Sequence, residues 1–325
     1  MVNYNRYSIP VQASVWRTGS VTPAPHERTS PSIRGDRYAR ATFLMGMDAT
    51  EFRQASHAVW EAMAPGWDTR HAYFEERARP VAKRMLERLE PQPGETILEL
   101  AAGTGVVGFA AARLVEPSGT VIVSDFSEAM VEAAARHAAD LGIGNVECRV
   151  LDAEQIRLQD DVVDAVLCRW GYMLMPEPEA AFAETRRVLR PGGRLSCAVF
   201  GAPELNPWVA LPSRVLRERG HTPASDAGAP GILALADRDR LSGLFVGAGF
   251  SEPRIEEVAF TWRFPDLDAY WEFLTGAAGA VAMVVDRLDS AEREHVRKQI
   301  VHEAARFADD EGLEIPAACL VASAS

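Results

Sequence analysis

The hydrophobic and polar positions change their period several times along the chain. Between residues 48 and 89 the apolar and aromatic positions recur at helical spacing, and the segment PQPG at 91–94 ends this stretch. Short apolar runs then alternate with helical patterns. We predict strands at 95–101, 119–124, 145–151, 162–169 and 194–200, and helices at 104–115, 127–141 and 178–189. This alternation is typical of βαβ units and predicts a parallel sheet in an α/β fold.

The pattern is less regular after residue 200. Residues 201–236 contain several Pro and Gly residues, and they are followed by a predicted helix at 238–248, a strand at 253–263, helices within 266–309 and a last strand at 315–322. We therefore expect a mostly parallel sheet of seven strands, in which the last two form an antiparallel edge near Phe260 and Leu320. Residues 48–325 are expected to form one domain, with N-terminal helices at 48–90, a core at 95–200 and helical insertions beyond it.

The first 45 residues differ from the rest of the chain. They are rich in Arg, Ser, Thr and Pro, poor in acidic residues, and show no apolar periodicity. We expect either a disordered tail or a start site assigned too early, with Met45 or Met47 as the true first residue.

Composition excludes some classes of function. The net charge of −12 argues against a nucleic-acid partner, because binding to phosphates needs a basic face. No apolar run approaches the roughly 20 residues of a membrane-spanning helix, so we expect a cytoplasmic protein. The cysteines are widely spaced and form no CxxC pair or His-Cys cluster, which predicts reduced thiols and no metal site. They are Cys148, Cys168, Cys197 and Cys319.

A glycine-rich segment follows the first strand of the predicted core. Gly103, Gly105 and Gly108 lie between an apolar strand and a helix, which is the setting of a nucleotide-binding loop. Asp125 lies 22 residues after Gly103, at the end of the second strand, where a carboxylate can accept hydrogen bonds from both ribose hydroxyls. This spacing fits an NAD(P)-dependent oxidoreductase as well as other adenosine cofactors.

Two more carboxylates favour a positively charged cofactor. Glu99 lies within the strand before the glycines, where it would repel a pyrophosphate but attract the ammonium and sulfonium groups of S-adenosylmethionine. Asp152 follows the third strand, where it can accept a hydrogen bond from an adenine amino group. A contact at a helix end for Glu99 and a surface turn for Asp152 are the plainer alternatives.

Four segments in order carry a family resemblance: ILELAAGTGVVG (97–108), VIVSDFSEAM (121–130), LDAEQI (151–156) and RRVLRPGGRLSCAVFG (186–201). Together they resemble class I S-adenosylmethionine-dependent methyltransferases, and most closely the ubiquinone/menaquinone C-methyltransferase group, over about residues 50–325. The resemblance implies a Rossmann-like three-layer sandwich with S-adenosyl-L-methionine as its cofactor. The residues expected to bind the cofactor are Glu99, Ala101, Gly103, Thr104, Gly105, Asp125, Phe126, Met130, Asp152, Ala153 and Arg169.

Within this set the resemblance places Glu99 and the glycine loop at the methionine moiety, Asp125 at the ribose, and Asp152 with Ala153 at the adenine. Met130 is expected near the adenine or in the core. Arg169 departs from the pattern, because the quinone methyltransferases tend to carry a small hydroxyl residue there. Its guanidinium is expected either to bind an acidic group of the substrate or to pair with a carboxylate of the site.

The acceptor is expected to be a small apolar or aromatic molecule that is methylated on carbon or oxygen. The chain lacks the Asn-Pro-Pro-Tyr-like tetrapeptide of enzymes that methylate nucleobases or glutamine. Candidate bases are His57 and His71, and candidate substrate contacts are Trp67, Tyr172, Trp208 and Trp271. An oxidoreductase and a cofactor-binding protein without turnover remain as alternatives, although no Tyr-x-x-x-Lys pair supports the first.

Overall fold

The computed structural model describes residues 48–222 and 229–325, which belong to one compact unit. The segment 1–45, expected to be a tail or a false start, lies outside the described residues. The described chain begins with three helices, α1 (Ala49–Thr69), α2 (His71–Arg77) and α3 (Arg79–Leu89). Asp48 starts α1 through a capping box, in which its side chain accepts hydrogen bonds from the N–H groups of Thr50 and Glu51.

A central sheet follows in the order β3-β2-β1-β4-β5-β8-β6, with the short strand β7 paired to β8. The strands from β3 to β5 are parallel, and β8 runs antiparallel to both β5 and β6. The predicted α/β fold with an antiparallel edge is confirmed. The strands are β1 (Thr96–Leu100), β2 (Thr120–Asp125), β3 (Val146–Val150), β4 (Val163–Arg169), β5 (Leu189–Phe200), β6 (Arg254–Phe264), β7 (Ala308–Asp309) and β8 (Gly312–Ala324).

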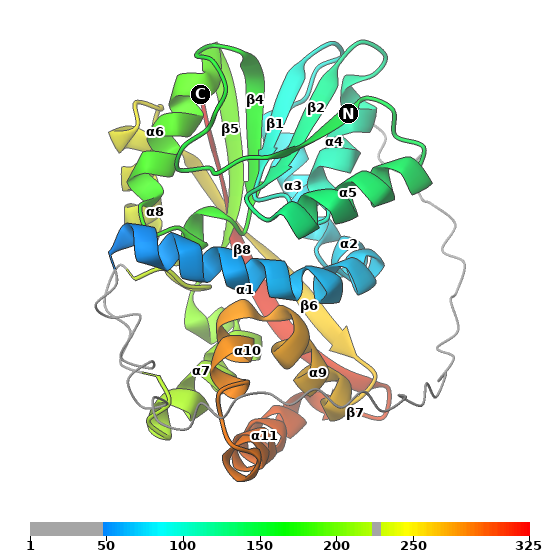
Figure 1. The fold of residues 1–325 in the computed structure, drawn as a ribbon, viewed down its shortest axis with the longest axis vertical. Coiled ribbons are helices and arrows are strands. Elements are labelled where there is room, and N and C mark those ends of the chain that lie inside the picture. The colour runs from blue at the N-terminus through cyan, green and yellow to red at the C-terminus, as the bar shows by residue number, and fades with distance from the viewer. Residues whose placement is uncertain (1–47, 223–228) are drawn as a thin grey trace, which may run out of the picture. The chain divides into compact units, whose positions relative to one another are not determined.

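Helices enclose this sheet. Figure 1 shows α6 and α8 on one side of the strands and α3, α4 and α5 on the other. The apolar strands are buried because both faces are covered, which is why they read in the sequence as continuous hydrophobic runs. The remaining helices are α4 (Val106–Val115), α5 (Glu128–Asp140), α6 (Pro178–Val188), α7 (Pro207–Glu218), α8 (Arg238–Gly247), α9 (Leu267–Ala277), α10 (Gly279–Val285) and α11 (Ser290–Ala304).

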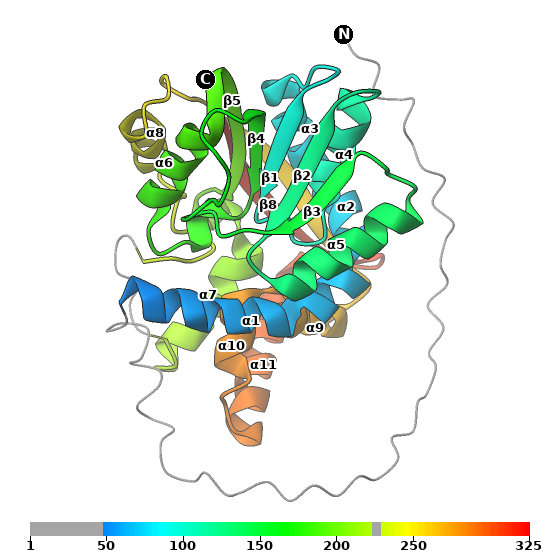
Figure 2. The same ribbon diagram turned by 45° about the horizontal axis from the view of Figure 1, so that its top comes forward.

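The first helix lies between the sheet and the late helices. Figures 1 and 2 both show α1 crossing beneath the strands, with α7, α9, α10 and α11 on its far side. It packs against α5, α9 and α10. It therefore connects a helix of the parallel part of the sheet to helices that come about 200 residues later in the chain. The space enclosed by these helices and the carboxyl ends of the strands is the place where an open α/β sheet binds its ligands.

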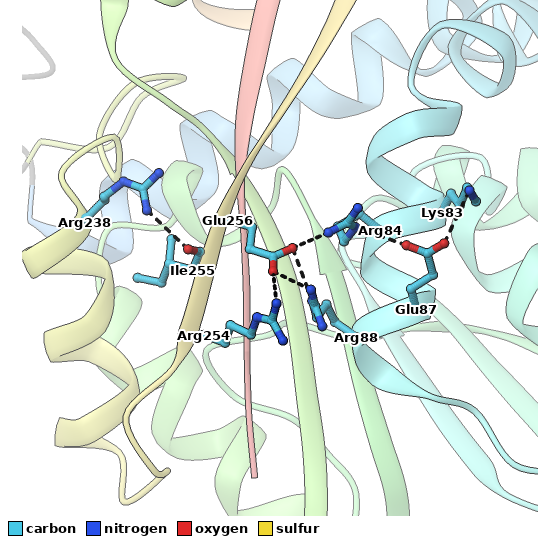
Figure 3. Close-up of polar contacts among 8 residues, drawn as sticks. All are labelled: Lys83, Arg84, Glu87, Arg88, Arg238, Arg254, Ile255 and Glu256. Atoms are coloured by element: carbon cyan, nitrogen blue, oxygen red, sulfur yellow. Dashed lines mark hydrogen bonds and ion pairs between the residues drawn. The ribbon is translucent and has the colours of Figure 1, made fainter. Parts of the chain in front are cut away.

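An ion-pair network fixes α3 to the edge strand β6 (Figure 3). The Glu256 carboxylate accepts hydrogen bonds from Arg84 and Arg88 of α3 and pairs with Arg254 at 2.6 Å on its own strand. Beside it, Arg238 donates to the Ile255 carbonyl at 3.2 Å. These ion pairs join α3 to the outermost strand of the sheet.

The structure differs from the sequence prediction in three details. Strand β5 begins at Leu189, five residues before the predicted start, because the RPGG turn is itself part of the strand. Strand β8 begins at Gly312 and forms a hairpin with β7, which was not predicted.

No helix in the part of the chain that the structure describes has the length and apolar character needed to cross a membrane.

Candidate functional site

The glycine loop joins β1 to α4. Gly105 has a φ of 86°, and a Cβ there would lie 2.4 Å from Cζ of Phe109. Gly108 is helical, and a Cβ there would lie 2.3 Å from Oε2 of Glu99. The loop therefore needs glycine at these positions for two reasons, a left-handed backbone at the first and space for a carboxylate at the second.

Glu99 occupies the space that Gly108 leaves. Its side chain is buried, with 2% of the residue exposed, and Oε2 accepts a hydrogen bond from the Gly108 N–H at 2.8 Å. Burial raises the pKa of this carboxyl group to about 8, although the charge of Arg169 opposes the shift. A carboxylate held in so little water favours a cationic ligand beside it.

Asp125 ends β2 on the other side of the loop. Its carboxylate accepts hydrogen bonds from the N–H groups of Gly103 at 2.8 Å and Ser127 at 3.0 Å. Burial raises its pKa, and these hydrogen bonds lower it. The carboxyl groups of Asp125 and Glu99 thus accept hydrogen bonds from N–H groups of the loop and of the first turn of α4. In a phosphate-binding loop such N–H groups would be free to bind the phosphate.

Arg169 ends β4 at the same edge of the sheet. Its Cζ lies 4.6 Å from the ring centroid of Trp170, and its buried Nη1 has no hydrogen-bond partner among the described residues. Burial lowers its pKa to about 10, so the guanidinium stays charged at neutral pH. The expected pairing with a carboxylate of the site is absent, since no carboxylate oxygen of the described residues forms an ion pair with Arg169.

The segment after β3 connects the sheet to α1. Asp152 accepts a hydrogen bond from the Glu154 N–H at 2.9 Å, and Glu154 in turn accepts one from Nε of Arg53 at 2.6 Å. At the other end of α1, Asp68 pairs with His137 of α5 at 2.7 Å. Ion pairs near both ends therefore hold α1 over this edge of the sheet.

A large cavity opens between these elements, with about 1300 Å³ of empty space when the solvent at its mouth is counted. One part of its wall comes from β1, β2, β4 and the segment after β3, and the other from α1, α7, α9 and β6. Its lining includes the expected cofactor residues Glu99, Ala101, Gly103, Asp125, Phe126, Met130, Asp152, Ala153 and Arg169, and the expected substrate residues Trp67 and Trp208.

Six aromatic side chains of the cavity wall contact one another, and we call the part of the cavity that they line the aromatic chamber. The rings stand 4.9 to 6.1 Å apart between neighbours, from stacked Trp170 and Phe200 to the tilted pair Trp170 and Trp262. Such close ring contacts make a rigid apolar surface suited to a flat ligand. The members are Phe74, Trp170, Phe200, Trp208, Trp262 and Phe273.

The other sequence-predicted residues do not line the cavity, namely Thr104, Gly105, His57, His71, Tyr172 and Trp271. His71 is buried, and its Nδ1 lies 2.8 Å from Oγ1 of Thr104. Burial, together with the nearby His137, lowers the pKa of His71 to about 4. The two imidazole rings stack at 3.9 Å. This pair therefore supports the glycine loop from behind.

His57 packs edge-on against Phe126, with 5.4 Å between ring centroids. The hydroxyl of Tyr172 lies 2.7 Å from Oγ1 of Thr185, in the packing between η3 (Tyr172–Leu174) and α6. Trp271 is buried in α9. These side chains therefore do not face the cavity and instead pack against neighbouring residues.

Sequence reasoning missed several residues of the cavity wall. The signal for Glu154 was present, because it lies next to Asp152 in the segment that ends β3. Nothing local distinguishes Arg53, Trp262 or Phe273, since their approach to the cavity depends on how distant helices and β6 pack. The missed residues also include Ser56, Phe74, Met175, Phe200 and Ile232.

The cysteines and other possible ligands show no metal centre in the described residues. All four cysteines are free thiols, and burial raises the pKa of Cys168 and Cys319 to about 12. No group of three or more His, Cys, Asp or Glu side chains within 48–222 and 229–325 is arranged to hold a metal ion.

Comparison with known proteins agrees with this architecture. Residues 91–214 match a family model described as a methyltransferase domain. The nocamycin O-methyltransferase of Saccharothrix syringae is 35% identical over 176 residues, which cover 54% of this chain and 60% of that protein. The ubiquinone/menaquinone biosynthesis C-methyltransferase of Escherichia fergusonii is 32% identical over 48% of this chain and 66% of its own length. The matches thus span less than two thirds of these relatives.

Two solved structures share the fold. A candidate methyltransferase of Bacillus halodurans aligns with a TM-score of 0.53 and 19% identity, over 75% of this chain and 97% of that one. The YcgJ protein of Bacillus subtilis aligns with a TM-score of 0.51 and 19% identity, over 75% and 96%. The motif order, the sheet topology and the sequence matches together make this chain similar to the class I S-adenosylmethionine-dependent methyltransferases, and residues 91–214 match a methyltransferase domain.

Proposed function

We propose that this protein binds S-adenosylmethionine in the cavity and transfers its methyl group to a carbon or oxygen atom of a small apolar or aromatic molecule. The observation that carries the proposal is that one acidic and one basic side chain are buried together at the glycine loop. Glu99 and Arg169 are both buried on the cavity wall, and Nη1 of Arg169 has no partner among the described residues.

This pair fits the methionine end of the cofactor. An α-amino acid carries one ammonium and one carboxylate, so it complements a buried carboxylate and a buried guanidinium in one cavity. Arg169 would bind the carboxylate through its unpartnered nitrogen, and Glu99 would attract the ammonium. The ligand would supply an ion-pair partner for each of these two side chains. This explains why Glu99 and Arg169 form no ion pair with each other.

The adenosine end would lie toward β2 and the segment after β3. Each oxygen of Asp125 accepts one backbone hydrogen bond and keeps lone pairs for the ribose hydroxyls. Asp152 lines the same wall and would accept from the adenine amino group. Phe126, Met130 and Ala153 supply apolar surface around it.

The bound cofactor supplies a methyl group on a sulfonium, which is reactive without further activation. The protein's contribution is to hold an acceptor atom in line with the methyl carbon at near-attack distance and to exclude water. The aromatic chamber offers the rigid surface that such positioning needs. Helix α1, held near both ends by Arg53 and Asp68, forms part of the cavity wall.

An NAD(P)-dependent reaction is disfavoured by the same geometry. Glu99 accepts the Gly108 N–H and Asp125 accepts the Gly103 N–H, so the loop presents negative charge where a pyrophosphate would need positive charge.

Isothermal titration of the purified protein tests the proposal. We expect S-adenosylmethionine and S-adenosylhomocysteine to bind and NAD and NADP not to bind. Arg169→Met should weaken S-adenosylhomocysteine by roughly tenfold or more, because it removes a charged hydrogen bond. Arg217→Met, on the last turn of α7 away from the cavity wall, serves as the matched control. Binding of NAD in place of the adenosyl compounds would refute the proposal.

Binding alone would not show turnover. A panel of quinols, phenols, fatty acids and amines, incubated with S-adenosylmethionine labelled in its methyl group, tests the transfer step. If the cofactor binds and the label reaches no acceptor, the protein is a cofactor-binding protein without turnover and the transfer part of the proposal fails.

A further inference from the structure

The aromatic chamber contains one polar group that the protein leaves unused. The indole N–H groups of three cavity tryptophans are bonded within the protein: Trp67 to the Ala277 carbonyl at 3.2 Å, Trp170 to Sγ of Cys319 at 3.2 Å, and Trp208 to Oδ1 of Asn206 at 3.3 Å. Trp262 lines the same wall and is only 1% exposed, yet its Nε1 has no partner. A buried donor without an acceptor is unfavourable unless a ligand supplies one.

Trp262 lies at the centre of the chamber. Its ring is 5.1 Å from that of Phe260, 5.2 Å from Phe273 and 5.6 Å from Trp208, measured between centroids. The surrounding side chains are aromatic, and the hydroxyl of Tyr73, whose ring stacks on Trp262 at 5.8 Å, is bonded to the Arg263 carbonyl at 3.0 Å. Because Trp262 belongs to the cavity wall and its N–H has no partner among the described residues, a ligand in the chamber could supply the missing acceptor.

The chamber also lacks a general base. The carboxylates on the cavity wall each accept a hydrogen bond from the protein: Glu99 from Gly108, Asp125 from Gly103 and Ser127, Asp152 from the Glu154 N–H, and Glu154 from Arg53. In the proposed function Glu99, Asp125 and Asp152 are also engaged by the cofactor. None of them belongs to the aromatic chamber. His57 and His71, the two candidate bases, do not line the cavity. The six side chains of the chamber include no carboxylate and no imidazole, so an acceptor bound among them is not in contact with a ready base of the chamber.

These two observations restrict the acceptor. Resting on the function proposed above, we propose that the acceptor is a flat apolar molecule bearing an oxygen acid that is already ionised at neutral pH, and that Trp262 donates its indole N–H to that group. The chemistry is shared by a carboxylate, the enolate of an acidic enol and the phenolate of an acidic phenol. Methylation then takes place on oxygen.

The transfer step balances without a base. A lone pair of the acceptor oxyanion forms the O–C bond to the methyl carbon, while the C–S bond breaks and its electron pair stays on sulfur. The negative charge of the oxygen and the positive charge of the sulfonium are both lost, and no proton is released. The chamber is suited to such a step, because bringing opposite charges together in an apolar site strengthens their attraction.

The first test is binding to the protein saturated with S-adenosylhomocysteine. 2-Naphthoate and its neutral isostere 2-naphthamide are titrated by calorimetry, together with the acidic phenol 2,4-dinitrophenol and the weakly acidic 2-naphthol. We expect the ionised compounds to bind about tenfold or more tightly than their neutral counterparts, because a hydrogen bond to a charged group is the stronger kind. If no oxyanion of this panel binds, or the neutral partners bind as well, the inference is wrong.

Trp262→Phe isolates the N–H while it keeps an aromatic ring. We expect it to remove most of the preference for naphthoate over naphthamide. Trp208→Phe is the matched control, because the Trp208 N–H is already bonded to Asn206; it should weaken both ligands alike and leave their ratio unchanged. In uniformly ¹⁵N-labelled protein, the indole signal assigned by its loss in Trp262→Phe should shift on addition of naphthoate. An unmoved signal would contradict the proposed contact.

The second test is the pH dependence of kcat/KM for substituted oxygen acids of different acidity, measured at saturating S-adenosylmethionine so that the titration of Glu99 on cofactor binding does not contribute. Without a protein base, the acidic limb of the profile should move with the pKa of each acceptor. A limb that stays at one pH across the series would reveal a protein base and overturn the inference. Binding of S-adenosylhomocysteine separates the two proposals. If S-adenosylhomocysteine does not bind, the proposed function is wrong. If it binds but the oxyanions do not, only the proposed class of acceptor is wrong.

Discussion

Gly108 donates its backbone N–H to the carboxylate of Glu99 across 2.8 Å, and its missing side chain makes room for that carboxylate. The third glycine of the loop is thus coupled to the acidic residue of β1. In a dinucleotide-binding loop the corresponding space lets a helix approach a strand. Here it admits a charged group into the wall of the cavity.

Gly108→Ala should destabilise the protein by roughly 1–3 kcal/mol, the usual range for an overpacked core, and should weaken S-adenosylhomocysteine binding. The added Cβ would lie 2.3 Å from Oε2 of Glu99 and 2.8 Å from Cγ2 of Val123. Urea unfolding and calorimetry check both effects. The control is Gly243→Ala in α8, where nothing lies within 4 Å of the added Cβ. It should stabilise the helix by up to about 1 kcal/mol. Equal behaviour of the two variants would contradict the account.

Cofactor binding should release a proton through Glu99. Its pKa of about 8 means that the carboxyl group is largely protonated in the free protein at pH 7, whereas an ammonium ligand favours the ionised form. Affinity should therefore fall as the pH drops below 8. Calorimetry in two buffers of different ionisation enthalpy counts the proton, and Glu99→Gln should abolish the release. A count that is the same in this variant would exclude Glu99 as the source.

The same shift affects the free protein. Because the folded state holds the Glu99 proton more tightly than the unfolded state, stability should be greatest below pH 4.5 as far as this group is concerned and should be lost as the pH rises toward 8. The slope should be smaller in Glu99→Gln.

His71 should act in the opposite direction. Its pKa is lowered to about 4, so the unfolded chain binds the proton more tightly, and stability should fall as the pH drops from 6.5 toward 4. Urea midpoints at pH 5 and pH 7 measure the difference, which should shrink in His71→Gln. His295→Gln, at a side chain that is 64% exposed, provides the control and should leave the difference unchanged. If His71→Gln leaves it unchanged too, another group causes the acid sensitivity.

Glu256→Gln should destabilise the fold by about 1 kcal/mol, because three guanidinium groups lose their shared carboxylate (Figure 3). The effect should shrink at high salt, since these side chains are partly exposed. Glu314→Gln is the control: its pair with Arg263 joins side chains that are 46% and 60% exposed. We expect that variant to lie within about 0.5 kcal/mol of the wild type. Equal losses in urea unfolding would refute a special role for the network.

The sequence predicted most of the fold because β1, β2 and β4 are buried on both faces and appear as apolar runs, whereas the partly buried β3 was predicted from the alternation of strands and helices. Strands β1 to β4 fall within one residue of their predicted ends. The prediction was weaker where Gly and Pro interrupt the pattern, as at the RPGG turn inside β5. It was weakest for β7, whose two residues are too short to show any period.

The candidate site divides in the same way. The positions after β1, β2, β3 and β4 could be predicted from chain order, because parallel strands end at one edge of a sheet. Tyr172 and Trp271 show the opposite case: each is a large aromatic residue near the site, but its ring lies in the packing behind the wall. Which face of such a side chain meets a cavity depends on tertiary packing, and periodicity does not report it.

The bond between Trp67 and the Ala277 carbonyl, which joins residues 210 apart, also has a consequence for how the protein folds. The βα units from β1 to β4 rest on contacts between neighbouring segments and can form early, whereas α1 and α9 meet only when the two ends of the described chain come together. Contacts that close so long a loop form late and open first. Hydrogen exchange should therefore be fastest in α1, α9 and α10, while the strands of the sheet remain protected.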